Sequence, residues 1–236
     1  HTMPEWLSFD PNSGVLSGTP GNDEVGSHLV ALRVADVAGV AASTYFEQSF
    51  DVVVENVNDV PTLSTTTSLT VTEDDATDQI SYIGFDIDPT SDELSFNFSQ
   101  PQHGTVSDEG NTFIYTPFAD YSGSDSFKIT VSDGTLEVDE IVNISVTAVN
   151  DKPVVSVSAS AGEETTAIED QLYSFTFLGS DVDQGDIVTL TAPILPAWLS
   201  FEQSTGVLSG TPEDAHVGNH PVSIVATDES GGFSEQ

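Results

Sequence analysis

Apolar and polar residues alternate along most of this chain with the period of two that is typical of half-buried β-strands. Residues 50–54 (FDVVV) and 144–149 (ISVTAV) are clear examples. Short runs of this kind recur between clusters of Gly, Asn, Asp, Ser and Pro, and no segment keeps the apolar period of an amphipathic helix. The pattern predicts an all-β protein made of β-sandwiches.

Two short acidic linkers divide the chain at residues 56–61 (NVNDVP) and 150–153 (NDKP). Each linker follows one of the alternating runs, and its proline cannot donate to a β-ladder. We therefore predict three segments. They are the C-terminal part of a sandwich over residues 1–57, a complete sandwich over 58–150, and a sandwich lacking its last strand over 151–236.

The outer segments share a repeat over residues 4–39 and 196–231. Both copies carry W-L-S-F, G-V-L-S-G-T-P and V-G-x-H in the same order. This pattern resembles the dystroglycan-type cadherin-like (CADG) module. The motifs T-E-D, P-Q-H-G-T-V, Y-S-G-S-D-S-F and V-S-D-G in the middle segment resemble the tandem-95 or VCBS-like cadherin-like repeats of bacterial surface proteins. Together the resemblances imply tandem Greek-key β-sandwiches of the cadherin/Ig type in a linear array.

Four residues of the repeat are interpreted as structural. Trp6 and Trp198 are expected to anchor the cores of the outer segments, because burying rings of this size dominates a small core. His28 and His220 are expected to be ordinary strand residues and not metal ligands or catalytic groups.

The composition is strongly acidic, with 39 Asp and Glu against 3 Lys and Arg and a formal net charge of −36. Nucleic acids and anionic membrane surfaces select basic patches, so neither is an expected partner. The chain has no cysteine and no apolar run long enough to insert into a membrane. Salt or bound cations must offset the repulsion among so many carboxylates.

The acidic clusters near the linkers predict calcium sites. Ca²⁺ takes about six to eight oxygen ligands, and two aspartates in an Asp-x-Asp loop can point to one ion. In a Greek-key sandwich the relevant loops can gather at the end next to the preceding linker. The first predicted site contains Asn58, Asp59, Asp86, Asp88 and Asp133. The second contains Asn150, Asp151, Asp181, Asp183 and Asp228, with Glu73 and Asp74 from the middle segment.

Aspartate and asparagine also favour turns for local hydrogen-bonding reasons, so each residue alone fits an ordinary turn. Recurrence of the set in two different modules favours a cation, and resemblance to cadherins implies the same arrangement. The first site lacks a Glu-Asp pair from residues 1–57, so we expect it to bind more weakly. An EF-hand is excluded, because the sixth position from Asp181 is Asp186 and not glycine.

The signatures of common enzymes, including H-E-x-x-H and G-x-S-x-G, are missing, so we expect no enzymatic activity. The main hypothesis is a calcium-binding, extracellular cadherin-like repeat region of a large bacterial surface or secreted adhesin, with Ca²⁺ stiffening the junctions. Its partners would be glycans or cell-surface proteins.

Two alternatives stay open. One is a calcium-dependent carbohydrate-binding accessory module, which an exposed aromatic platform would favour. The other is a peptide- or protein-binding adhesin domain, which an exposed groove would favour. Open strand edges in the incomplete terminal sandwiches also predict self-association.

Overall fold

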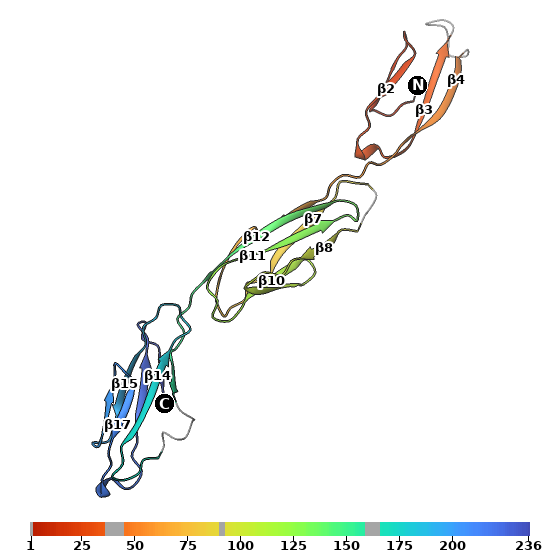
Figure 1. Ribbon diagram of the computed structural model, residues 1–236. Helices are drawn as coiled ribbons and strands as arrows, with labels where there is room; N and C mark the ends of the chain where they lie inside the picture. The colour runs from red at the N-terminus through yellow and green to blue at the C-terminus, as the bar shows by residue number, and fades with distance from the viewer. Residues whose placement is uncertain (1, 36–44, 90–92, 159–165) are drawn as a thin grey trace. The chain divides into compact units, whose positions relative to one another are not determined.

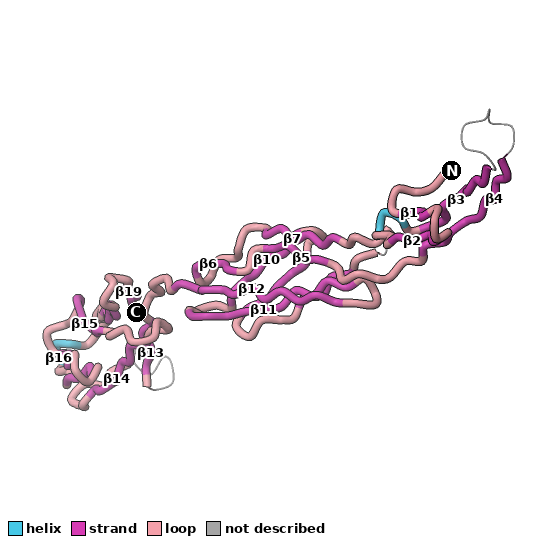
Figure 2. Tube along the Cα trace, turned by 90° about the horizontal axis from the view of Figure 1, so that it is seen from above, coloured by secondary structure: helices cyan, strands magenta, loops and turns pink. Residues whose placement is uncertain are grey.

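The computed structural model describes residues 2–35, 45–89, 93–158 and 166–236. Strands dominate these residues, and the helical elements are short 3₁₀ turns, η1 (Asn22–Glu24) and η3 (Asp214–His216) (Figures 1 and 2). The chain forms two compact units. The first contains residues 1–69, 77–116 and 125–144, and the second contains residues 70–76, 117–124 and 145–236. Among the described residues, no helix is long and apolar enough to cross a bilayer.

The N-terminal segment consists of two antiparallel strand pairs. They are β1 (Leu7–Asp10) with β2 (Val15–Gly18), and β3 (Gly26–Ala35) with β4 (Tyr45–Val54). The second pair runs in unbroken register from Gly26↔Val54 to Ala35↔Tyr45. Trp6 packs edge-on against His28, with ring centroids 5.7 Å apart.

The middle segment has two four-stranded sheets in the orders β5-β7-β10-β9 and β6-β12-β11-β8. The strands are β5 (Thr62–Thr65), β6 (Ser68–Thr72), β7 (Ile80–Phe85), β8 (Ser95–Phe98), β9 (Gly104–Asp108), β10 (Thr112–Pro117), β11 (Gly123–Ser132) and β12 (Glu137–Thr147). Alternate residues of the strands point inward, so Phe113 and Phe127 are buried and meet edge-on at 5.1 Å. Burial of side chains of this size stabilises the fold by about 1.5–3 kcal/mol each.

The C-terminal segment has a four-stranded sheet, β13-β14-β17-β16, and a three-stranded sheet, β15-β18-β19. The strands are β13 (Val154–Val157), β14 (Tyr173–Ser180), β15 (Thr189–Ile194), β16 (Leu199–Glu202), β17 (Val207–Gly210), β18 (Ser223–Thr227) and β19 (Phe233–Glu235). Figure 1 shows β14 and β17 side by side in this segment. Leu208, Ile224 and Ala226 are almost fully buried between the sheets.

The all-β expectation is confirmed: the alternating run at 50–54 forms the end of β4, and the run at 144–149 forms the end of β12 and continues two residues beyond it. The segment boundaries after residues 57 and 150 stay predictions. The C-terminal segment ends in the three-residue β19, which is equivalent to the beginning of β4, so the prediction that this segment lacks its last strand also stays a prediction.

The interpretation of the two repeat histidines is right for one and wrong for the other. His28 lies in β3, where it pairs with Val52. His220 lies before β18, outside any strand.

Candidate metal centre

The second linker brings together acidic side chains from three parts of the second unit. Asn150 donates from its side-chain amide to Asp228 Oδ2 at 3.0 Å. The main-chain N–H of Asp151 donates to Asp183 Oδ2 at 2.8 Å. The main-chain N–H of Asp183 in turn donates to Asp181 Oδ1 at 3.1 Å. These bonds fix the Asp-x-Asp loop after β14 against the linker.

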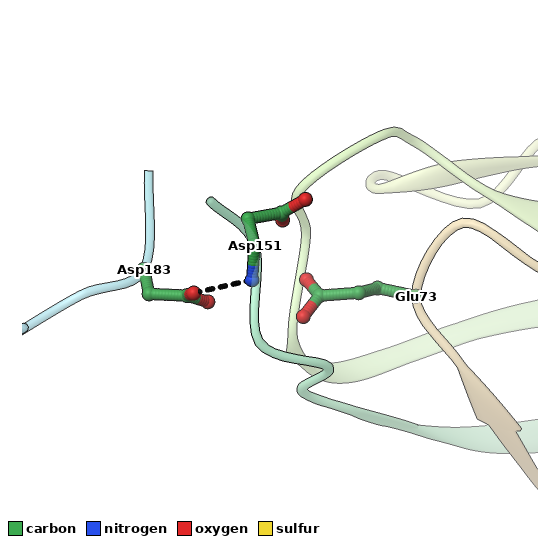
Figure 3. Close-up of side chains that lie close together, drawn as sticks. All are labelled: Glu73, Asp151 and Asp183. Carbon is green, nitrogen blue, oxygen red and sulfur yellow. Dashed lines mark hydrogen bonds between the residues drawn. The ribbon is translucent and has the colours of Figure 1, made fainter. Parts of the chain in front are cut away.

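Glu73 approaches the same linker from the loop after β6. Its side chain is only 3% exposed, and its Oε1 accepts a hydrogen bond from the main chain of Val149 at 2.5 Å. Figure 3 shows the carboxylates of Glu73 and Asp183 pointing toward the linker from opposite sides, with Asp151 between them. Ligand oxygens of these three residues lie within 4.8 Å of one another.

Two further carboxylate groups have the same compactness. One contains Asp74, Asp120 and Asp151, and the other contains Asp181, Asp186 and Asp228. Oxygens within 4.8 Å of one another are no further apart than about twice a calcium–oxygen distance, so the three oxygens of each group can bind one ion. Asp151 belongs to two of the three groups, which places the linker at the centre of the cluster.

Buried oxygens without hydrogen-bond partners show that the cluster is not satisfied by the described protein groups alone. Among the described residues, the Oδ2 atoms of Asp151, Asp181 and Asp186 are inaccessible to water and have no hydrogen-bond partner. An unpaired polar atom of this kind is costly, and for a charged oxygen the cost is larger still. A bound cation would remove that cost, so the donor set fits a hard divalent ion.

Gly232 forms one wall of this centre. Its main-chain N–H donates to Asp228 Oδ1 at 2.8 Å. A Cβ at position 232 would lie 2.3 Å from Asp228 Oδ2 and 3.1 Å from the amide nitrogen of Asn150. Only a residue without a side chain therefore lets the Asn150–Asp228 pair keep its position.

The electrostatics of the cluster raise some carboxyl pKa values and lower others. Burial, and then the neighbouring carboxylates of Asp120 and Asp74, raise the pKa of Asp151. Burial followed by repulsion from Asp183 likewise raises the pKa of Asp186. The hydrogen bond from the Asn150 amide lowers the pKa of Asp228.

Binding of a cation to this cluster should release protons under mildly acidic conditions. Without a cation, Asp151 and Asp186 contribute stability that is full below the ordinary aspartate pKa of about 3.9 and is lost as the pH rises through their raised values. A cation displaces those protons, so its affinity should fall as the pH drops from 7 toward 4. Calcium titrations at pH 5 in two buffers of different ionisation enthalpy should show proton release. Equal heats in both buffers would contradict the prediction.

The first linker repeats the geometry within the first unit. Asn58 donates from its side-chain amide to Asp133 Oδ2 at 2.9 Å, as Asn150 does to Asp228. Asp59 donates from its main chain to Asp88 Oδ2 at 2.8 Å, and Asp88 donates from its main chain to Asp86 Oδ1 at 2.9 Å. The local bonding of the two linkers is therefore the same.

The two linkers differ in what faces the second aspartate. Asp59 Oδ2 accepts a hydrogen bond from the side-chain amide of Asn22 at 2.6 Å, so the neighbour of Asp59 is a neutral group. The neighbours of Asp151, the equivalent residue of the second linker, are the carboxylates of Glu73, Asp74 and Asp120. Over the described ranges, the three-carboxylate groups all belong to the second linker. This arrangement agrees with the expectation that the first site binds more weakly, which stays a prediction.

All twelve predicted site residues lie in the two linker clusters, and their role as ligands stays a prediction. Sequence reasoning missed Asp120 and Asp186. The sequence did contain a signal for Asp186, since it lies in the same loop as Asp181 and Asp183, directly after Gly185. Asp120 had none, because only the approach of its loop to Asp74 brings it into the cluster.

Tandem β-sandwiches joined by short acidic linkers define a protein of the Ig/cadherin-like class. A family model described as "Putative Ig domain" matches residues 1–50 and 152–236, more than half of the chain. The chain therefore belongs to this Ig-domain family. A second model, "Bacterial Ig domain", matches residues 58–147. Neither match distinguishes the CADG or tandem-95 types, so those finer assignments stay predictions.

Known proteins are similar to this chain in sequence or in fold. The protein GAMETE EXPRESSED 2 of Arabidopsis thaliana is 28% identical over 173 residues, which cover 68% of this chain and 16% of that protein. The fold is similar to human CDH23 EC21-23, with a TM-score of 0.55 at 12% identity over 98% of this chain and 80% of that chain. It is also similar to protocadherin gamma B2 extracellular cadherin domains 3-6, with a TM-score of 0.53 at 14% identity over 100% of this chain and 63% of that chain.

Proposed function

We propose that the chain is a non-catalytic, calcium-binding repeat region of a large extracellular bacterial adhesin. In this role, Ca²⁺ ties the linker at Asn150–Asp151 to the loops that carry Glu73 and Asp183. The observation that carries the proposal is the convergence of Glu73, Asp151 and Asp183, together with the unpartnered buried oxygen of Asp151. The ion would replace repulsion by attraction and so stiffen the linker.

The magnitude of the repulsion supports a bound cation. Two carboxylates about 4 Å apart repel by about 1 kcal/mol in water and by about 4 kcal/mol at an effective dielectric constant of about 20. Several carboxylates converge on one linker in a chain whose formal net charge is −36. Without a counter-ion these side chains would move apart, and the linker would lose its hydrogen bonds to Asp183 and Asp228.

Calcium is favoured over magnesium by the donor set. Ca²⁺ accepts many carboxylate and carbonyl oxygens in flexible geometry, whereas Mg²⁺ demands near-octahedral geometry and keeps several waters. The cluster offers several carboxylates and few neutral side chains, which suits the larger ion.

Calorimetric titration of the full chain with Ca²⁺ and, separately, with Mg²⁺ tests the proposal. We expect saturable Ca²⁺ binding with a tighter phase from the second linker and a weaker phase from the first, and weaker binding of Mg²⁺. Small-angle scattering on the same samples should show less linker flexibility with Ca²⁺. Absence of Ca²⁺ heat at millimolar ion, or equal affinity for both ions, would reject calcium as the ligand.

The observation that would favour carbohydrate binding is an exposed aromatic platform, and the tryptophans do not supply one. Trp6 and Trp198 are half-buried, and their indole nitrogens are inaccessible to water. Trp198 instead contributes to the wall of a groove in the C-terminal segment. Glycans and cell-surface proteins remain the proposed classes of partner for the adhesin.

A further inference from the structure

The sheet β5-β7-β10-β9 of the middle segment has an uncharged outer face. Side chains along each strand alternate between the core and this face, and paired residues such as Ser81 and Thr112 point to the same side. The outward positions of the four strands are Thr62, Ser64, Ser81, Ile83, Phe85, Thr105, Ser107, Thr112, Ile114 and Thr116. None of these residues is charged, although the chain contains 39 acidic residues.

The second sheet of the same segment has a charged outer face. Lys128 of β11 and Glu137 and Asp139 of β12 are exposed there, each beside inward-facing residues of its strand. Lys128 Nζ forms an ion pair with Asp139 at 2.9 Å. The lack of charge is therefore a property of one sheet and not of the whole sandwich.

Large apolar side chains gather on the uncharged face next to the first linker. Ile83 and Phe85 of β7 are 65% and 62% exposed, and both pair with small polar residues of β5. Val60 and Ile87 lie at the next alternate positions of the two chain segments and are also more than half exposed. We call Val60, Ile83, Phe85 and Ile87 the first stripe. A contiguous exposed group of this kind marks an interaction site more often than scattered apolar residues do.

The C-terminal segment has a corresponding group beside the second linker. Val154 of β13, Leu178 of β14 and Val182 in the Asp-x-Asp loop are each about half exposed, and we call them the second stripe. The sequences at 83–88 (IGFDID) and 178–183 (LGSDVD) have the same order of apolar, glycine and aspartate residues. Within the four described strands of this sheet, the outer face contains one charged residue, Glu202 of the edge strand β16.

The glycine of each sequence shows why its neighbours face outward. A Cβ at Gly84 would lie 2.7 Å from the ring of Phe96, and a Cβ at Gly179 would lie 2.5 Å from Val188. Both glycines therefore lie against the core, and the residues on either side of them point to solvent. The stripes thus occupy equivalent places in two modules that match different family models.

The chemistry of these faces suits a second copy of the same chain. Carboxylates only accept hydrogen bonds, whereas the hydroxyls of Ser and Thr both donate and accept them. A face of hydroxyl and apolar groups is therefore complementary to itself, as an interface with two-fold symmetry requires. Each chain has a formal net charge of −36, so contact between two copies is least opposed where carboxylates are absent. A cationic partner would instead prefer the acidic surfaces.

We propose that the two stripes and the uncharged sheet faces around them form an interface between two copies of this chain. A specific interface buries about 800 Å² per partner, and a single stripe supplies only part of that area. Two identical chains carry both stripes at the same spacing, so contact at one stripe raises the effective concentration at the other. The repetition of the stripe in two modules fits a contact of this kind.

The interface is separate from the proposed calcium ligands. Asp86 and Asp88 alternate with Phe85 and Ile87 along the chain, and their carboxylates accept main-chain hydrogen bonds at the first linker. Association of two copies therefore requires no bound ion. Experiments in chelator test it without depending on calcium binding.

Sedimentation velocity of the full chain in chelator, over a range of protein concentrations, tests the proposal. We expect a monomer–dimer equilibrium that tightens as the salt rises from about 0.05 M to about 0.5 M, because salt screens the repulsion between the two acidic chains. A chain that stays monomeric at millimolar concentration in high salt would assign the faces to another partner and overturn the proposal. An association that weakens as salt rises would contradict an apolar interface.

Two variants locate the interface. Phe85→Asp and Leu178→Asp place a carboxylate in the first and second stripe, and each should raise the dissociation constant of the dimer at least about tenfold. Ile141→Asp and Ile194→Asp are the matched controls, since these residues are 56% and 49% exposed in the other sheet of the same segments. The controls add the same charge and should leave the dissociation constant nearly unchanged.

The four substitutions are at exposed positions, so each variant should keep the fold, which circular dichroism checks. A dissociation constant that changes equally in a stripe variant and in its control would show that added charge alone weakens the dimer. That result would overturn the assignment of the interface to the stripes.

Discussion

Asp183→Asn should weaken calcium binding at the second linker by at least about 100-fold, because loss of groups that merely support a metal ligand already costs about 10- to 100-fold. Asparagine has the same shape and keeps an oxygen for the main-chain N–H of Asp151, which Asp183 now accepts at 2.8 Å. The local fold should therefore persist while one negative charge is lost. Calorimetric titration of the full chain measures the effect.

Asp88→Asn is the matched control for this substitution. Asp88 accepts a 2.8 Å hydrogen bond from the main chain of Asp59, as Asp183 does from Asp151, but no three-carboxylate group surrounds it among the described residues. Asp88→Asn should remove only the weaker binding event and leave the tighter one intact. Equal losses in the two variants, or unchanged stoichiometry in both, would reject these ligand sets.

Calcium should raise the melting temperature of the C-terminal sandwich by about 10–20 °C when the free ion is at about 100 times its dissociation constant. Binding to the folded state alone adds about 2.7 kcal/mol at that ratio. For a domain of about 60–100 residues, each kcal/mol shifts the melting temperature by about 4–8 °C. Scanning calorimetry with Ca²⁺ and with a chelator measures the shift.

Two controls test whether the rise in melting temperature comes from calcium bound at the second linker. Asp183→Asn should lose most of the calcium-dependent shift while melting near the unmodified chain in chelator. Magnesium at the same concentration should give a smaller shift. A shift of the same size in Asp183→Asn would assign the stabilisation to general screening of the net charge and contradict specific binding at the linker.

The residues that gather at both linkers could be named from short sequence patterns. Asn58–Asp59 and Asn150–Asp151 interrupt alternating strands, and the Asp-x-Asp loops that bond to them follow β7 and β14. The patterns could be recognised because Asp and Asn favour turns for local reasons, although the hydrogen bonds from the linkers to the Asp-x-Asp loops span 29 and 32 residues. The recurrence of the pattern in two modules made it specific.

Site residues that come from distant parts of the chain could not be predicted from such patterns. Asp120 has no neighbouring motif, and it joins Asp74 and Asp151 only because loops distant in sequence pack together. Asn22 in turn faces Asp59 from η1 and so distinguishes the first linker from the second. The separation of these residues along the sequence does not predict that they are neighbours. Their proximity depends on the tertiary structure.

The sequence by itself determined an all-β chain, its repeated outer modules and the two linkers with their flanking Asp-x-Asp loops, because alternation and turn chemistry act over a few residues. Tertiary structure decided which carboxylates converge on Asp151 and paired His28 with Val52 in a strand. The physical reason is that metal-site geometry and strand pairing both require partners from distant parts of the chain, and local sequence does not specify which partners arrive.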